Sequence, residues 1–167
     1  RVLFRSCERG LILVTINYRL GVFGFLAHPW LSEESSVGRS GNYAILDQIA
    51  ALKWVKENIA AFGGDSENIT VFGQSAGCMS VQTLVSSPLT ENWISKAIFQ
   101  SAGGYDTGLN RDMLLSEAET IGQEFVELSG AKSLEELRAI PAEQIVELQE
   151  EFGRVNPSRM LSFVPNI

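Results

Sequence analysis

A serine at position 75 stands in the pattern Gly-x-Ser-x-Gly, which residues 73–77 form. A strand-like apolar run, residues 69–72, leads directly into this pattern, and a segment compatible with a helix follows it. A sharp turn between a strand and a helix holds a serine hydroxyl out of the chain, where it can attack a substrate. We therefore expect Ser75 to be a catalytic nucleophile. The simpler alternative is a loop whose glycines serve turn geometry and whose serine caps a helix.

The neighbours of Ser75 are expected to support this role. Gly73 and Gly77 would be needed because the turn brings backbone segments too close together for side chains at these positions. The backbone N–H of Ala76 would lie in the first turn of the following helix, where N–H groups are unpaired and a partial positive charge accumulates. We expect this N–H to stabilise an oxyanion.

The elements that must position Ser75 alternate between strands and helices. Apolar and β-branched runs predict strands at residues 11–17, 69–72 and 97–99. Apolar residues at three- and four-residue steps predict a helix over residues 42–62, which Gly63 and Gly64 end. Further helices are predicted over residues 76–85, 114–129, 134–140 and 142–152, and an irregular connection over residues 21–41. This alternation predicts an α/β fold with a mostly parallel sheet and flanking helices.

Composition excludes several classes of partner. The net charge of −7 argues against nucleic-acid binding, which needs clustered Lys and Arg. No apolar run approaches the roughly 20 residues that cross a bilayer. Residues 117–151 hold ten Glu against Lys132 and Arg138, and such a run is typical of the solvated face of helices. Cys7 and Cys78 are too few and too far apart for a disulfide framework, and we predict neither a metal nor a cofactor.

Five blocks of the sequence resemble, in the same order, blocks of the type B carboxylesterases, a family that includes para-nitrobenzyl esterases and cholinesterases. The blocks are residues 17–25, 41–48, 62–65, 72–77 and 99–103, and the resemblance spans about residues 9–152. It implies the α/β-hydrolase fold with a nucleophile elbow at Ser75. It also implies hydrolysis of small-molecule esters through an acyl-enzyme, with Ala76 N–H as an oxyanion donor.

The resemblance also suggests that the chain is part of a longer protein. Residues 1–6 equal the translation of a common sequencing adapter, so we expect them to be a non-native scar, and residues 7–167 to be a partial domain from environmental, bacterial DNA. In the family, a glycine-rich loop with further oxyanion donors precedes this segment, and the triad acid and histidine follow it. His28, the only histidine, precedes Ser75 and is not expected to be the base. The chain alone is therefore expected to be inactive and, lacking a sheet strand, prone to aggregate.

Four further residues bear on the site or on the structure around it. The family usually has Glu where this chain has Gln74, and a neutral amide there should weaken the preference of the catalytic histidine for its protonated form. Arg19 and Asp47 match positions that form a structural ion pair in the family. Ser101, which follows the strand at 97–99, is expected to support the site structurally.

Two other functions stay open. Some relatives of this family are adhesion proteins that kept the fold and lost the nucleophile, although Ser75 is present here. Another serine acyl hydrolase, such as a thioesterase or a peptidase, would use the same serine turn, because a fold alone does not fix its chemistry. The sequence does not determine localisation, oligomeric state or the acyl and alcohol groups that are accepted.

Overall fold

The computed structural model of the protein describes residues 8–103, 113–159 and 163–165. The chain divides into two units, one made of residues 1–18 and 45–104 and the other of residues 19–44 and 105–167. The expected scar at residues 1–6, and Cys7, lie outside the described residues. The serine turn belongs to the first unit and His28 to the second.

The first unit contains the strand and helix that flank Ser75. Its elements are most of helix α4 (Tyr43–Asn58), the 3-10 helix η1 (Ile59–Phe62), strand β1 (Thr70–Gln74), helix α5 (Ala76–Ser86), the 3-10 helix η2 (Pro88–Thr90) and strand β2 (Lys96–Gln100). These bounds confirm the strands predicted at residues 69–72 and 97–99 and the helices predicted over residues 42–62 and 76–85.

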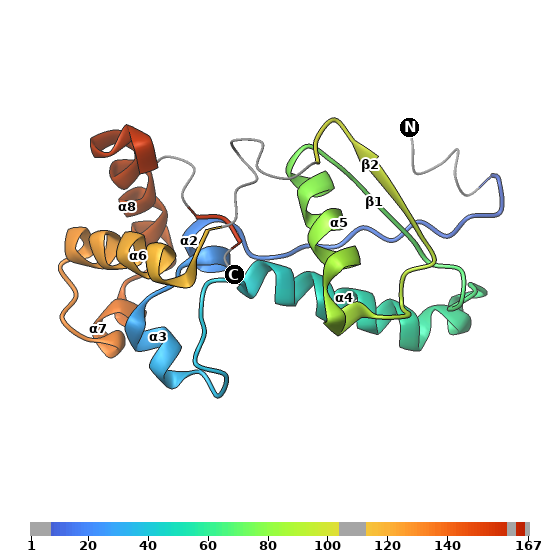
Figure 1. The fold of residues 1–167 in the computed structure, drawn as a ribbon, viewed down its shortest axis with the longest axis horizontal. Coiled ribbons are helices and arrows are strands. Elements are labelled where there is room, and N and C mark those ends of the chain that lie inside the picture. Colours follow the sequence, from blue (N-terminus) through green and yellow to red (C-terminus); the bar gives the residue numbers. More distant parts are fainter. Residues whose placement is uncertain (1–7, 104–112, 160–162, 166–167) are drawn as a thin grey trace. The chain divides into compact units, whose positions relative to one another are not determined.

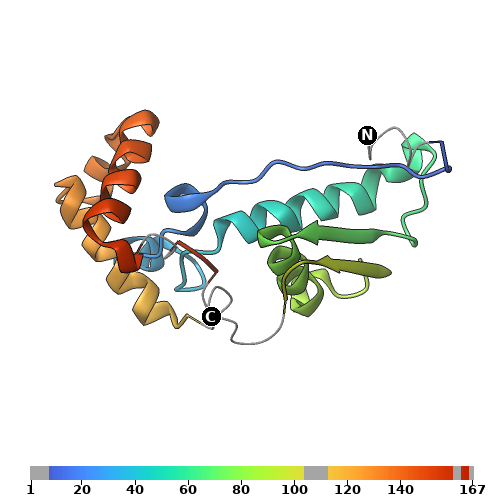
Figure 2. The same ribbon diagram turned by 90° about the horizontal axis from the view of Figure 1, so that it is seen from above.

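Strands β1 and β2 form a parallel pair, with α5 as the connection between them (Figure 1). The register runs from Thr70 opposite Lys96 to Gln74 opposite Gln100. Helix α5 packs against both strands, as the view from above also shows (Figure 2). The expected parallel sheet with a flanking helix is thus confirmed. Its consequence for the site is that the carboxyl ends of both strands meet at one edge.

The strand predicted at residues 11–17 is wrong. This segment forms an extended trace (Figure 2), but it pairs with no strand in the described part of the chain. Its apolar side chains, expected to be covered on both faces, are largely exposed, from 40% for Val14 to 59% for Leu11. A strand requires a hydrogen-bonding neighbour, and the described residues provide none for this segment.

Helix α4 buries one apolar stripe, and its continuation, the 3-10 helix η1, ends where the sequence predicts. Ile45, Leu52 and Ile59 of the predicted stripe are buried. Gly63 follows with φ of 80°, a left-handed conformation that glycine adopts without steric cost and that commonly ends helices. On the same helix, the Gln48 amide donates to Ser80 Oγ of α5 at 3.2 Å, which links the two helices of this unit.

The second unit is helical in its described residues. It contains helices α2 (Gly21–Phe25), α3 (Pro29–Glu34), α6 (Leu115–Ser129), α7 (Leu134–Ala139) and α8 (Ala142–Val155) and the 3-10 helix η3 (Pro157–Arg159). The predicted helices over residues 114–129, 134–140 and 142–152 are confirmed. The irregular connection predicted over residues 21–41 is wrong, because it contains α2 and α3.

The two unpredicted helices are short and depend on tertiary contacts. Val22, Leu26 and Ala27 are buried in the core of the second unit, which isolated sequence periodicity over five residues could not reveal. At the start of α3, Pro29 occupies the first turn and His28 caps it. Short helices of this kind form only where packing and capping compensate for the cost of nucleation.

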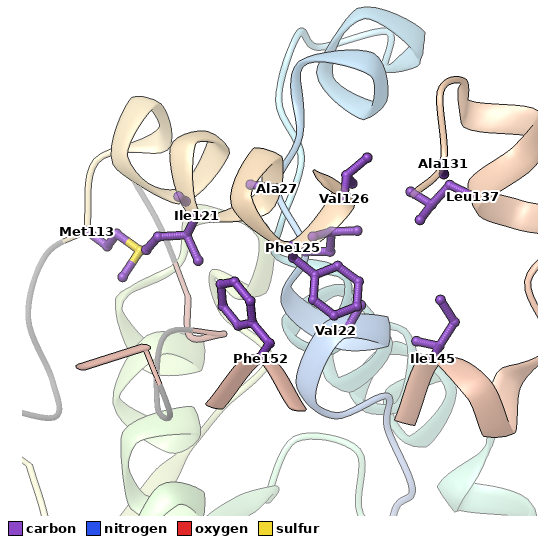
Figure 3. Close-up of a cluster of buried hydrophobic side chains, with 12 residues drawn as sticks. Val22, Ala27, Met113, Ile121, Phe125, Val126, Ala131, Leu137, Ile145 and Phe152 are labelled. Atoms are coloured by element: carbon purple, nitrogen blue, oxygen red, sulfur yellow. The ribbon is translucent and has the colours of Figure 1, made fainter. Parts of the chain in front are cut away.

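The core of the second unit is built around aromatic rings (Figure 3). Phe125 of α6 and Phe152 of α8 meet edge to face with ring centroids 5.7 Å apart, and Phe163 lies 5.6 Å from Phe125. Edge-to-face contacts match the positive ring edge of one residue to the negative face of another. Gly122 of α6 approaches the backbone carbonyl of Ala27 so closely that no side chain would fit between them.

The surface of the second unit carries the acidic run. None of the ten glutamates between residues 117 and 151 is buried, so the prediction of a solvated helix face is confirmed. Arg138 of α7 donates to both carboxylate oxygens of Glu34 of α3, at 3.0 and 2.6 Å, and this hydrogen bonding lowers the pKa of Glu34. No helix among the described residues combines the length and the apolar character needed to cross a bilayer.

Candidate functional site

Ser75 lies in a sharp turn between β1 and α5. Its backbone has φ of 52° and ψ of −120°, a left-handed conformation that side-chain-bearing residues rarely adopt. Its side chain is exposed. A strained residue between the end of a strand and the start of a helix, with its side chain exposed, is the geometry of a nucleophile elbow.

Backbone hydrogen bonds fix the turn on both sides of Ser75. The N–H of Ser75 donates to the carbonyl oxygen of Gln100, the last residue of β2, at 3.0 Å. The carbonyl oxygen of Ser75 accepts from the N–H groups of Cys78 and Met79, at 2.8 and 3.2 Å. Both peptide groups of the serine are therefore engaged, and the backbone at position 75 is fixed from both sides.

The two glycines of the motif have different roles. A Cβ atom at Gly73 would overlap the backbone carbonyl of Gly77, so the turn requires glycine at position 73, as predicted. A Cβ atom at Gly77 would meet nothing within 4 Å among the described residues, so the predicted clash there is wrong. The close contact is between Gly73, near the end of β1, and the carbonyl group of Gly77. A side chain at position 77 would point away from this contact.

Free backbone donors lie beside the serine. The N–H groups of Ala76 and Gly77, in the first turn of α5, donate no hydrogen bond within the described ranges. The Ser75 side chain does not cap α5 either, which removes the main support for the alternative of a simple capping loop. The 11 residues of α5 also direct their positive dipole end toward this point. An anion that develops next to the Ser75 hydroxyl would meet unpaired donors there.

A second serine has a positive φ at the end of the neighbouring strand. Ser101 follows β2 with φ of 54° and is exposed, and residues 100–103 repeat the Gln-Ser-Ala-Gly sequence of residues 74–77. The buried Cys78 donates its S–H to the carbonyl oxygen of Ala102 at 2.8 Å, which ties the second turn to α5. The sequence did not reveal that Gln100 and Cys78 anchor the two turns, although the repeated tetrapeptide was a signal.

His28 is engaged in the second unit as a helix cap. It is 4% exposed, and its Nδ1 accepts the backbone N–H of Trp30 at 3.1 Å at the start of α3. Burial lowers its pKa below the ordinary value of 6.5, while the charges of Glu119 and Glu33 act in the opposite direction. The ring is thus neutral near pH 7, with its proton on Nε2. A general base needs a free acceptor nitrogen, and the acceptor nitrogen of His28 is already occupied.

The remaining residues singled out in the sequence are placed as follows. Gln74 ends β1, opposite Gln100, and its side chain is exposed. The guanidinium of Arg19 lies over the ring of Tyr43, 5.3 Å from its centroid. Arg19 and Asp47 belong to different units, and their ion pair stays a prediction. In the described part of the chain, His, Cys, Asp and Glu side chains nowhere form a group of three that could hold a metal ion.

Known proteins resemble this chain in sequence and in fold. The chain is 51% identical over 118 residues to fumonisin B1 esterase of Sphingopyxis macrogoltabida, a match that covers 70% of this chain and 21% of the relative. It is 41% identical over 148 residues to para-nitrobenzyl esterase of Bacillus subtilis, covering 87% of this chain and 28% of the relative. The structure superposes on a carboxylesterase of Geobacillus stearothermophilus with a TM-score of 0.72 and 40% identity, over 85% of this chain and 28% of the other.

The chain therefore spans between 21% and 28% of the length of these relatives. The superposition on a carboxylesterase at 40% identity confirms the α/β-hydrolase fold expected from the resemblance. Because residues 3–167 match the model of the carboxylesterase family, the chain belongs to the carboxylesterase family.

Proposed function

We propose that the whole protein hydrolyses carboxylic esters of small molecules and that Ser75 is its nucleophile. The observation that carries this proposal is the strained, exposed position of Ser75 between β1 and α5. Attack of Ser75 Oγ on the ester carbonyl forms a tetrahedral intermediate, and expulsion of the alcohol leaves an acyl-serine. Water then attacks the acyl-serine and releases the carboxylic acid, which restores the serine.

The oxyanion of both tetrahedral intermediates would be stabilised by the N–H of Ala76. Support comes from the absence of any partner for this N–H among the described residues and from its place in the first turn of α5. One such donor typically contributes about 3–4 kcal/mol to transition-state stabilisation. Gly73 supports the site by allowing the close approach of the strand end to Gly77.

The base that activates Ser75 is proposed to be a residue other than His28. His28 uses its acceptor nitrogen to cap α3, and it is the only histidine of the chain. The chain spans 21% of one relative and 28% of another, so we assign the catalytic histidine and its acidic partner to the rest of the protein. Arg19 and Asp47 are proposed to form a structural ion pair, and Ser101 to support the turn at Ser75.

Covalent labelling tests the assignment of Ser75. A fluorophosphonate reacts with an activated serine, so the whole protein should gain one phosphonyl group on the peptide that contains Ser75. Ser101 provides an internal control, since it has a similar positive φ and the same local sequence as Ser75. A label on Ser101, or no label on either serine, would contradict the proposal.

Turnover assays separate the alternative functions. The Ser75→Ala variant should lose activity on a short-chain nitrophenyl ester by a factor on the order of 10⁶ in kcat. An adhesion protein without catalysis would show neither labelling nor turnover. A thioesterase or peptidase would be labelled at Ser75 but would give a higher kcat/KM for a thioester or a peptide than for the ester.

A further inference from the structure

A pocket of about 290 Å³ lies in the second unit, between the start of α3, one face of α6 and the residues that follow α6. The lining residues that matter here are His28, Trp30, Gln123, Val126, Glu127 and Lys132. We call it the Trp30 pocket. We propose that the Trp30 pocket binds a small, uncharged aromatic amide. This inference concerns only the second unit and does not depend on the proposed esterase function.

The first support is a polar atom of His28 that has no partner. Its Nδ1 accepts from the N–H of Trp30, so the neutral ring carries its proton on Nε2. No hydrogen bond within the described residues uses Nε2, although the side chain is 4% exposed. Every buried side-chain nitrogen or oxygen in the described part either has a partner or keeps contact with solvent. The Nε2–H is therefore a fixed donor that remains accessible in a nearly buried ring that lines the pocket.

The second support is the shape and character of the walls. The Trp30 indole packs on the His28 ring, with centroids 4.4 Å apart and an angle of 57° between the planes. Val126 is buried and contributes an apolar surface from α6. An aromatic wall beside an apolar one, with a few fixed polar groups, is the usual composition of a small-molecule site. A planar ring in the pocket would contact the indole and Val126 while presenting a polar edge to His28.

Charge decides which polar group the ligand carries. The carboxylate of Glu127 and the ammonium of Lys132 both line the pocket and offset each other. The glutamate-rich helices around it disfavour an anionic ligand, and the Nε2–H donor disfavours a cationic one. A neutral amide carries no net charge and offers both a hydrogen-bond acceptor and hydrogen-bond donors to the pocket. Its carbonyl oxygen accepts from His28 Nε2, and its N–H groups donate to Glu127 or to the carbonyl oxygen of Gln123.

Titration with benzamide, followed by amide chemical shifts of the isotope-labelled protein, tests this inference. Benzamide should cause saturable shifts at residues of the Trp30 pocket. Benzoate and benzylammonium have the same ring with a negative and a positive charge, and both should bind at least about tenfold more weakly. Equal or tighter binding of either charged analogue, or the absence of saturable shifts with benzamide, would overturn the proposal.

Matched variants locate the binding. His28→Asn keeps an oxygen acceptor for the α3 cap and removes the Nε2–H donor, so it should weaken benzamide binding by about tenfold or more. Trp30→Leu should also weaken binding, whereas Trp54→Leu, at a tryptophan that is 50% exposed in the first unit, should leave it unchanged. Unaltered affinity in both His28→Asn and Trp30→Leu would exclude the site.

A further variant covers the case in which changes at His28 or Trp30 prevent folding. Gln123 is exposed on α6, so Gln123→Arg should fold, place a long side chain across the pocket and pair with Glu127 one turn later. This variant should lose benzamide binding by about tenfold or more. Benzamide binding to Gln123→Arg with the affinity of the unaltered chain would overturn the proposal.

Discussion

The backbone N–H of Ser75 donates to the carbonyl oxygen of Gln100 at 3.0 Å. This hydrogen bond continues the pairing of β1 and β2 by one step beyond Gln74 and Gln100, the last pair of the ladder. The turn that exposes the serine is therefore attached to the end of the neighbouring strand, and the two strand ends act together in holding it.

The two glycines of the serine motif should respond differently to alanine. In Gly73→Ala the new methyl group would overlap the Gly77 carbonyl, and the free energy of unfolding should fall by about 1–3 kcal/mol or more. In Gly77→Ala the methyl group meets nothing among the described residues and lies in the first turn of α5, so stability should be unchanged or rise by up to about 1 kcal/mol. Urea denaturation measures both. Equal losses in the two variants would show that the close approach at Gly73 does not exist.

The strained backbone of Ser75 should be relieved by glycine. With φ of 52° and ψ of −120°, this position has the conformation of the first central residue of a type II′ turn, which favours glycine. Ser75→Gly should therefore be more stable than Ser75→Ala by about 1 kcal/mol, although both lack the hydroxyl. Thermal or urea denaturation of the pair gives this difference directly. If the alanine variant is the more stable of the two, the left-handed turn is absent.

The stability of the protein should depend on pH through His28. Folding lowers the pKa of His28 below 6.5, mainly because the ring is buried, and the charges of Glu119 of α6 and Glu33 of α3 oppose this shift. Two further charged residues, Glu127 and Lys132, line the pocket beside the ring. The unfolded chain therefore binds a proton more readily than the folded one. The contribution of the neutral His28 ring to the free energy of unfolding is therefore fully present above pH 6.5 and is lost as the pH falls through the lowered pKa of the folded state. Protonation of Nδ1 would also remove the acceptor that caps α3.

Comparison with a variant that cannot titrate isolates this effect. His28→Asn keeps a capping oxygen but has no proton to gain. The free energy of unfolding of the unaltered chain, measured between about pH 5 and pH 7.5, should decline toward the acid end more steeply than that of the variant. Parallel curves for the two proteins would show that the pKa of His28 is the same in the folded and the unfolded chain.

Close packing in the second unit depends on glycine at position 122. A methyl group at this position would overlap the backbone carbonyl of Ala27, so Gly122→Ala should destabilise the fold by about 1–3 kcal/mol or more, against the usual benefit of alanine in a helix. Gln123→Ala, at the adjacent exposed position, serves as the control and should change stability by less than about 0.5 kcal/mol. Denaturation of both variants measures the difference. A Gly122→Ala protein as stable as the control would mean that α6 and the segment at Ala27 do not pack in this way.

The sequence by itself determined the local features of the site. The apolar run before Ser75, the Gly-x-Ser-x-Gly pattern and the periodic segment after it predicted a strand, a turn and a helix, and the structure has β1, Ser75 and α5 in that order. The helical segment formed by α4 and η1, and its end at Gly63, were equally predictable, since the signals are periodicity and a residue suited to a left-handed conformation. Such features are set by residues that are neighbours in sequence, so they can be predicted without knowledge of the tertiary structure.

Only the tertiary structure decided the features that depend on distant partners. Residues 11–17 have the composition of a strand but pair with no strand among the described residues. Helices α2 and α3 are too short to show a periodic pattern, and they form because Val22 of α2 is buried and His28 caps the start of α3. The partner of Ser75 N–H, Gln100, lies 25 positions further along the chain. The different roles of Gly73 and Gly77 likewise follow from one close contact between backbones, because two glycines of the same motif look alike until the positions of their neighbours are known.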